Sequence, residues 1–155
     1  MAELSPGMEA PDFVLPRDGG GTVQLSSLRG KPVVLFFYPK DDTEACTAEA
    51  IAFTGLRPDF EAAGAVVFGL SPDPVKKHDK FVKKHSLDVP LLSDETHEVL
   101  EAYGLWKEKS MYGRTYMGVE RTTLLLDAQG RIVRIWPKVK VPGHAEEVLE
   151  AVKSL

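Results

Sequence analysis

An uninterrupted apolar run, Val33-Val-Leu-Phe-Phe-Tyr38, constrains the fold of this chain more than any other feature. Its residues do not alternate between apolar and polar, so the run predicts a strand that other elements cover on both faces. Such strands are typical of sheets that carry helices on each side. With 155 residues, the chain has the length of one such domain, and we expect residues 1–155 to form it.

Strand and helix signals alternate along the rest of the chain. Two short strands at 12–16 and 22–25 flank a glycine-rich turn, and a helical turn follows at 25–30. After the apolar run, the pattern predicts a helix over 43–63 that Pro58 kinks or interrupts, a strand over 65–71, a helix over 74–85, an extended segment over 89–93, a helix over 95–103, a hairpin of 121–127 and 131–136, and a helix over 144–154. This order resembles a thioredoxin-like fold: an α/β fold with a central mixed β-sheet, flanking helices and a short N-terminal β extension.

The only cysteine, Cys46, lies in the first turn of the helix predicted to follow the apolar strand, with Thr43 as its natural N-cap. Unpaired amides and the positive end of the helix dipole favour a thiolate there. A lone cysteine is more often a buried and inert small hydrophobe. Its position in the first turn, the nearby Thr43 hydroxyl, and Pro39, which is expected to shield the site from water, favour a nucleophile instead.

The same residues resemble a known family. Pro39-x-x-x-Thr43-x-x-Cys46 matches the active-site motif of peroxiredoxins, and the run from Phe37 to Thr43 is similar to the Q-type subgroup, the bacterioferritin-comigratory proteins. Further landmarks of that subgroup follow in order: Ser71-Pro-Asp73, Lys80-Phe81, Pro90-Leu-Leu-Ser-Asp94, Tyr103-Gly-Leu-Trp106, Met111-Tyr-Gly113, Gly118-x-x-Arg121-x-Thr123 and Gly143-His-Ala145. The resemblance implies a thiol-dependent peroxidase that reduces hydrogen peroxide and alkyl hydroperoxides.

The resemblance also implies roles for five residues. Cys46 attacks the peroxide, Arg121 stabilises the thiolate and the developing oxyanion, Thr43 hydrogen-bonds sulfur or peroxide, and Pro39 limits water and over-oxidation. Without the family motif, Arg121 has the pattern of an exposed arginine at a strand end. Glu49 either orients Arg121 or is an ordinary solvated helix residue, and the sequence leaves both open. No cofactor is implied, and four scattered histidines without paired spacing argue against a metal site.

The chain departs from the subgroup in its cysteine content. Many Q-type relatives carry Pro-Gly before the active cysteine and a second cysteine five residues after it, where this chain has Glu44, Ala45 and Ile51. A sulfenic acid on Cys46 therefore has no partner within the chain, and an external thiol must resolve it: glutathione, glutaredoxin, thioredoxin or a second copy of the chain. The alternative is a peroxide sensor or redox interaction module that forms mixed disulfides through Cys46.

Charge and hydropathy narrow the class of partner. A formal net charge of -4 without a basic tail argues against nucleic acid. No apolar stretch approaches the length of a membrane span, and the acidic, proline-containing start is unlike a signal peptide. One cysteine cannot form an internal disulfide, which fits a reducing compartment, most simply the cytoplasm. We expect a monomer or a weak homodimer.

Overall fold

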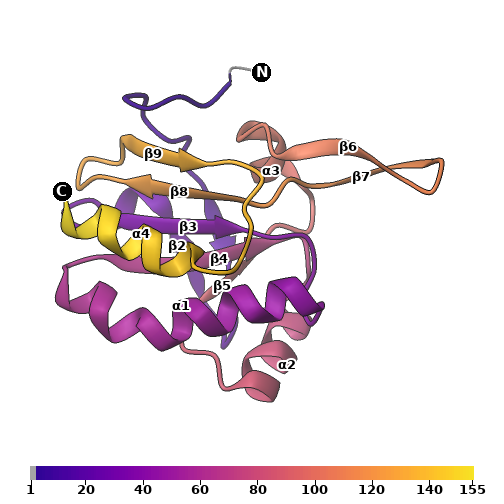
Figure 1. Cartoon of the computed structure of the whole chain (residues 1–155), viewed down its shortest axis with the longest axis horizontal. Helices are drawn as coiled ribbons and strands as arrows, with labels where there is room; N and C mark the ends of the chain where they lie inside the picture. Colours follow the sequence, from indigo (N-terminus) through magenta and orange to yellow (C-terminus); the bar gives the residue numbers. More distant parts are fainter. Residues whose placement is uncertain (1–2) are drawn as a thin grey trace.

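A computed structural model describes residues 3–155, which are built around a five-stranded sheet (Figure 1). The central strand, β3 (Val33–Phe37), pairs in parallel with β4 (Val66–Ser71) and antiparallel with β8 (Thr122–Leu126). Beyond these, β5 (Leu91–Ser93) extends the sheet on one side and β9 (Ile132–Trp136) on the other. The sheet is therefore mixed. All five residues of β3 are buried, as expected for a strand with an uninterrupted apolar sequence.

Three helices cover one face of the sheet: α1 (Glu44–Ala62), α2 (Val75–His85) and α4 (His144–Lys153). They bury Phe53, Phe81 and Val148 in a cluster with Phe36 of β3. The rings of Phe36 and Phe53 stack with centroids 4.6 Å apart. This packing fixes α1 on the sheet, and α1 begins beside the end of β3.

The opposite face carries a second apolar cluster. A 3-10 helix, η1 (Leu25–Leu28), and the short α3 (Glu98–Ala102) lie there, with Leu25 and Leu100 buried. Phe37 of β3 packs toward this side, with its ring centroid 5.4 Å from that of Tyr103. Alternate residues of β3 thus enter different cores, because successive strand side chains point to opposite faces.

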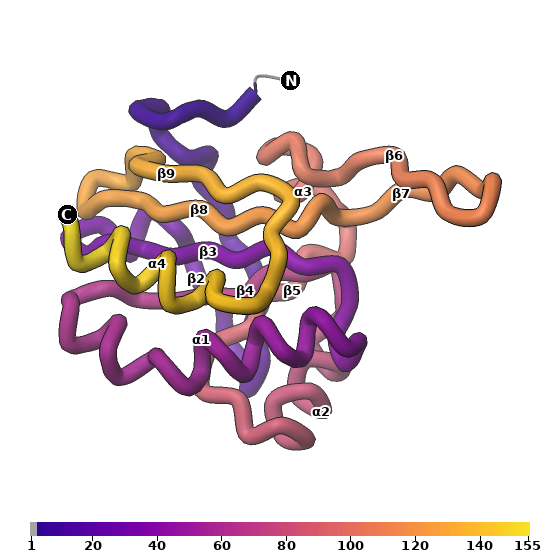
Figure 2. The backbone as a smooth tube through the Cα atoms, viewed as in Figure 1, coloured from indigo at the N-terminus to yellow at the C-terminus, as the bar shows by residue number. Residues whose placement is uncertain are grey.

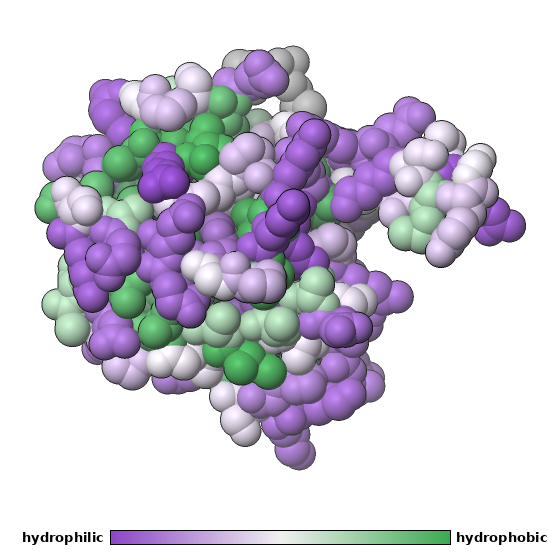
Figure 3. All heavy atoms as spheres, viewed as in Figure 1, coloured by the Kyte–Doolittle hydropathy of each residue, from purple (hydrophilic) through white to green (hydrophobic). Residues whose placement is uncertain are grey.

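Two hairpins lie outside the central sheet. β1 (Val14–Pro16) and β2 (Thr22–Gln24) form the predicted N-terminal β extension. β6 (Trp106–Met111) and β7 (Arg114–Val119) form an arm that projects from the body of the molecule, as the backbone trace in Figure 2 shows. The outer part of this arm stands clear of the body in Figure 3 and exposes large side chains: Met111, Tyr112, Tyr116 and Met117.

The predicted mixed α/β architecture is confirmed, with helices on both faces and a β extension at the start. Of the two predicted effects of Pro58, an interruption of the first helix is wrong, because α1 runs without a break from Glu44 to Ala62, whereas a kink stays a prediction. A proline removes one backbone donor, and a helix of 19 residues that is packed along one side tolerates that loss. The β6–β7 arm was not predicted. No helix within residues 3–155 has the length and hydropathy that crossing a bilayer requires.

Candidate active site

The end of β3 and the start of α1 meet in a short connecting segment, residues 38–43. The Tyr38 amide donates to the Leu70 carbonyl at 3.1 Å, which continues the β3–β4 ladder by one residue. Asp42 then adopts a left-handed conformation with φ 62°, and Thr43 occupies the N-cap position of α1. Through this turn the chain brings the first turn of α1 to the carboxyl-terminal edge of β3 (Figure 1).

Cys46 is the third residue of α1 and its side chain is buried, with 2% of the residue exposed. On one side it joins the apolar cluster around Phe53. The first i to i−4 hydrogen bond of the helix runs from the Thr47 amide to the Thr43 carbonyl at 2.9 Å. The amides before Thr47 therefore lie at the positive end of the helix, where they favour an anion on sulfur.

Arg121 completes the site from a distant part of the sequence. It immediately precedes β8, which pairs with β3, so strand pairing brings its guanidinium to the first turns of α1. Its Nη2 donates to Cys46 Sγ at 3.1 Å, and its Nη1 donates to Glu49 Oε1 at 2.7 Å. One planar cation thus joins the thiol and the carboxylate, which lie one helical turn apart.

Burial and charge act on these groups in opposite directions. Burial raises the pKa of Glu49 to about 7, although the charge and hydrogen bond of Arg121 oppose the rise. Burial by itself lowers the pKa of Arg121, but Glu49 and Cys46 outweigh it, so that pKa lies above its usual value. The second carboxylate oxygen, Glu49 Oε2, is buried and has no hydrogen-bond partner within residues 3–155. The site therefore holds a permanent cation beside a carboxyl group that titrates near neutral pH.

Thr43 and Pro39 lie on the segment that leads to the cysteine. Thr43 is exposed, and its hydroxyl donates to the Lys40 carbonyl at 3.1 Å without making a side-chain cap to the helix. Its oxygen is therefore free to accept a hydrogen bond rather than to donate one to sulfur. Pro39 is half-buried in the same segment. The structure thus brings Arg121 into direct contact with Cys46 and Glu49, while Thr43 and Pro39 lie on the segment that leads to Cys46.

Sequence reasoning missed Lys109, which the β6–β7 arm carries toward the site. Burial lowers the pKa of Lys109, and the Arg121 charge lowers it further, whereas Glu120 and Cys46 oppose both effects. The arm therefore adds a second cation to the electrostatic surroundings of Arg121 and Cys46. No motif points to this residue, because its proximity arises from strand pairing in a hairpin whose surfaces are largely exposed.

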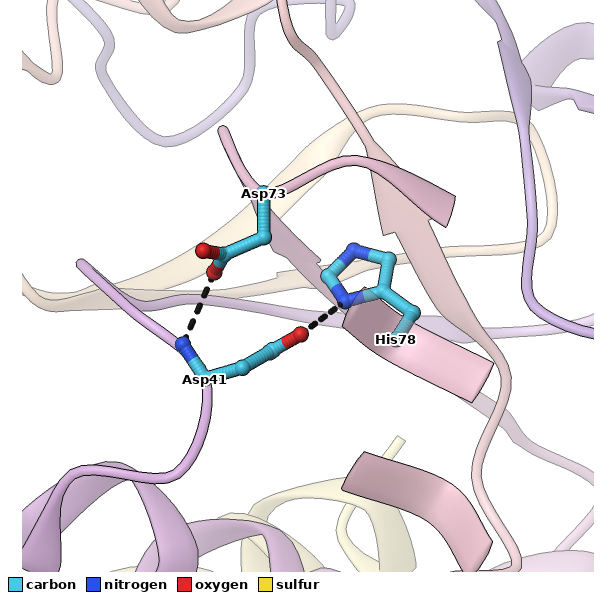
Figure 4. A group of neighbouring side chains, drawn as sticks. All are labelled: Asp41, Asp73 and His78. Carbon is cyan, nitrogen blue, oxygen red and sulfur yellow. Dashed lines mark hydrogen bonds and ion pairs between the residues drawn. The ribbon is translucent and has the colours of Figure 1, made fainter. Parts of the chain in front are cut away.

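A second buried cluster, Asp41, Asp73 and His78, brings together three side chains of types that bind metal ions (Figure 4). Their atoms are occupied by one another and by neighbouring donors. Asp41 accepts from the Tyr38 hydroxyl at 2.6 Å and pairs with His78 Nδ1 at 2.6 Å, while Asp73 accepts from the Ser71 hydroxyl at 2.7 Å and the Asp41 amide at 2.8 Å. The cluster is a closed hydrogen-bond network rather than an open ligand set.

Comparison with known proteins agrees with this geometry. The model of the AhpC/TSA family matches residues 6–135. Peroxiredoxin Bcp of Bacillus subtilis is 46% identical over 149 residues, which span 96% of this chain and 95% of that relative. A putative peroxiredoxin of Coxiella burnetii is 48% identical over 143 residues, which span 92% of this chain and 95% of that relative. The solved structure of the bacterioferritin comigratory protein of Xanthomonas campestris superposes with a TM-score of 0.90 at 42% identity, over 97% of this chain and 98% of that one. The Xanthomonas protein is described as having alkyl peroxide reduction activity.

Proposed function

The chain belongs to the AhpC/TSA family, and from that premise we propose that Cys46 is the residue that attacks the peroxide. The protein is a peroxiredoxin, an enzyme that uses a thiol to reduce peroxides. The 3.1 Å contact from Arg121 Nη2 to Cys46 Sγ carries the proposal, because it sets a permanent cation against the only thiol of the chain.

The proposed reaction begins with attack of the Cys46 thiolate on one peroxide oxygen. The S–O bond forms as the O–O bond breaks, and the other oxygen leaves as hydroxide or alkoxide and takes a proton to become water or alcohol. The sulfur is left as a sulfenic acid. Negative charge moves from sulfur to the leaving oxygen, and the Arg121 guanidinium, which already contacts Sγ, is placed to stabilise it at both positions.

The other site residues support this cation and the approach of substrate. Glu49 holds Nη1 of Arg121, which leaves Nη2 directed at the sulfur. Thr43 Oγ1 donates to a backbone carbonyl, so its lone pairs are placed to accept from the hydroxyl of an incoming peroxide. We assign Pro39, which is half-buried in the segment before Cys46, the role of limiting access of water. We thus assign Glu49 as a positioning residue and Thr43 as a substrate contact.

We propose that the oxidised sulfur is resolved by a thiol from outside the chain. A first external thiol displaces water from the sulfenic acid to give a mixed disulfide, and a second thiol releases Cys46 as thiol with formation of the external disulfide. Thioredoxin, glutaredoxin and glutathione all supply this chemistry. The activity associated with the Xanthomonas relative supports alkyl hydroperoxides as substrates beside hydrogen peroxide. We further propose that residues 1–155 act as one domain in a reducing compartment such as the cytoplasm.

Steady-state peroxide consumption with each reductant tests this proposal. The wild type is expected to consume many equivalents of peroxide, and Cys46→Ser none. Ala48→Ser is a matched control, because it adds a hydroxyl on an exposed residue of the same helical turn and keeps the thiol. Activity that persists in Cys46→Ser refutes the assignment. A wild type that is oxidised once and then remains as a mixed disulfide with every reductant favours a peroxide sensor instead.

A further inference from the structure

Asp41 ties the segment before the active cysteine to two distant parts of the fold. Its carboxylate accepts from the Tyr38 hydroxyl and pairs with His78 Nδ1, each at 2.6 Å, and its backbone amide donates to Asp73 Oδ2 at 2.8 Å. His78 lies on α2 and Asp73 follows β4, so the contacts span 37 and 32 residues of sequence (Figure 4). Pro39 and Thr43 lie two residues to either side of Asp41, and the position of the segment therefore depends on this residue.

The hydrogen bonds of His78 determine how many protons the pair holds. Nε2 lies 2.9 Å from the Leu92 carbonyl oxygen, which can only accept, so Nε2 carries a proton. Nδ1 lies 2.6 Å from Asp41 Oδ2, and a second proton must lie between them. Both residues are buried. The pair thus holds one proton more than a neutral imidazole beside a carboxylate would have, and an imidazolium facing a carboxylate is the charged arrangement of these protons.

The surroundings of His78 favour this charged form. Asp41 faces it from the segment after β3, and the other oxygen of Asp41 accepts from the Tyr38 hydroxyl. Asp73, at the end of β4, adds a second negative charge, and the Leu92 carbonyl faces the ring from β5. Lys77, its neighbour on α2, binds Asp73 at 3.2 Å. Burial alone would lower the pKa of His78, but the hydrogen bond and charge of Asp41 outweigh burial and raise that pKa above its ordinary value.

We propose that His78 is a positioning residue for the peroxidase reaction: as an imidazolium it holds Asp41, and through Asp41 the segment that carries Pro39 and Thr43 to Cys46. This inference rests on the proposed function of Cys46. Loss of one proton leaves a ring nitrogen lone pair facing an oxygen acceptor, either the Asp41 carboxylate at 2.6 Å or the Leu92 carbonyl at 2.9 Å. Either contact is repulsive in this buried site, so the ring and the segment that it holds shift. A displacement of about 1 Å near a reacting centre slows a reaction by up to about 100-fold.

The expected signature is a loss of activity at alkaline pH. Sulfenic acid formation is measured by single-turnover kinetics between about pH 5.5 and 9.5 for the wild type and for His78→Asn. The wild-type rate constant is expected to decrease at alkaline pH as His78 loses its proton. In His78→Asn the side-chain amide still donates to Asp41 but has no proton to lose at these pH values. Its rate is expected to be about 10-fold lower at the optimum, without the alkaline decrease.

His85→Asn is the matched control. His85 also lies on α2 and also contacts the segment, through Asp42 at 2.9 Å, but this contact is exposed to solvent and Lys84 binds Asp42 as well. Its pH profile is expected to match that of the wild type, because exposed ion pairs contribute little. The inference is overturned if the rate of His78→Asn still decreases at alkaline pH. That result would point to another group that loses a proton, such as Lys109.

Ring ¹⁵N resonances of His78 in the wild type provide a second test that depends on no variant. Both ring nitrogens are expected to be protonated at pH 7. A neutral ring at that pH overturns the inference even if the enzyme is fully active. This measurement decides the question even if His78→Asn does not fold. A wild type that forms no sulfenic acid at any pH refutes the proposed function as well, so the two failures are distinguishable.

Discussion

Replacing Arg121 with methionine removes the cation that contacts the nucleophile and keeps an unbranched side chain. The lost interaction is a charge-assisted hydrogen bond of 3.1 Å between Nη2 and Sγ, a class worth about 1.5–3 kcal/mol to the ground state. Because the same donor stabilises the leaving oxygen, the expected cost in the transition state is larger, about 10²–10³ in rate. The rate constant for sulfenic acid formation is therefore expected to decrease by that factor.

The same substitution also changes stability in a pH-dependent way. Removing one partner of a buried ion pair typically costs about 3–5 kcal/mol, because the other charge stays buried. Glu49 has a pKa of about 7 even with Arg121 present, so in the variant it avoids part of this cost by remaining protonated. Arg121→Met is therefore expected to lose less stability at pH 6 than at pH 8. Adding Glu49→Gln to the variant should remove the difference between the two pH values.

Two measurements test this reasoning. Stopped-flow kinetics with hydrogen peroxide give the rate, and urea unfolding at pH 6 and 8 gives the free energy of unfolding. Arg57→Met is the control, since Arg57 lies farther along α1 in an exposed ion pair with Glu61. A rate in Arg121→Met within threefold of the wild type refutes the assigned role. Equal destabilisation at both pH values refutes the account of Glu49.

Two further predictions concern stability. The folded-state pKa of Glu49, about 7, lies above the ordinary value of 4.5, so the folded protein binds more protons between these values and its stability should fall as pH rises through this window. Glu49→Gln should flatten that fall by about 3 kcal/mol in urea unfolding, and an unchanged slope contradicts the burial argument. Gly69→Ala should destabilise by about 1–3 kcal/mol, because the added Cβ would lie 2.7 Å from Phe36 Cζ. Gly55→Ala, in a helix and with open space around it, should instead stabilise the protein by about 1 kcal/mol. An unchanged free energy of unfolding in Gly69→Ala would contradict the packing argument, because it would show that Phe36 moves aside at little cost.

Local sequence signals predicted much of the architecture. The apolar run predicted that β3 is covered on both faces, because a strand buried on both sides has no polar alternation. The first-turn position of Cys46 followed from the start of an amphipathic pattern after that strand. The contact between Arg121 and Cys46 did not follow from such signals. It spans 75 residues and depends on the pairing of β8 with β3, and only the family motif indicated it.

Other features depend on tertiary contacts that no local pattern records. Most residues of the β6–β7 arm are exposed on both of its faces, so its strands lack the alternation that identifies a half-buried strand. In the sequence His78 is one of four scattered histidines, and its pairing with Asp41 arises only when α2 packs beside the segment before Cys46. The hydroxyl of Thr43, predicted to hydrogen-bond sulfur or peroxide, donates to the carbonyl of Lys40, and its contact with peroxide stays a prediction.

Mass spectrometry of the intact protein after one equivalent of hydrogen peroxide tests the central claim most directly. We expect a gain of one oxygen that maps to the peptide containing Cys46, and its replacement by a mixed disulfide when an external thiol is added. Peroxide consumed while Cys46 remains a free thiol, or oxygen found only on methionines, contradicts the claim that an arginine-held sulfur performs the reaction.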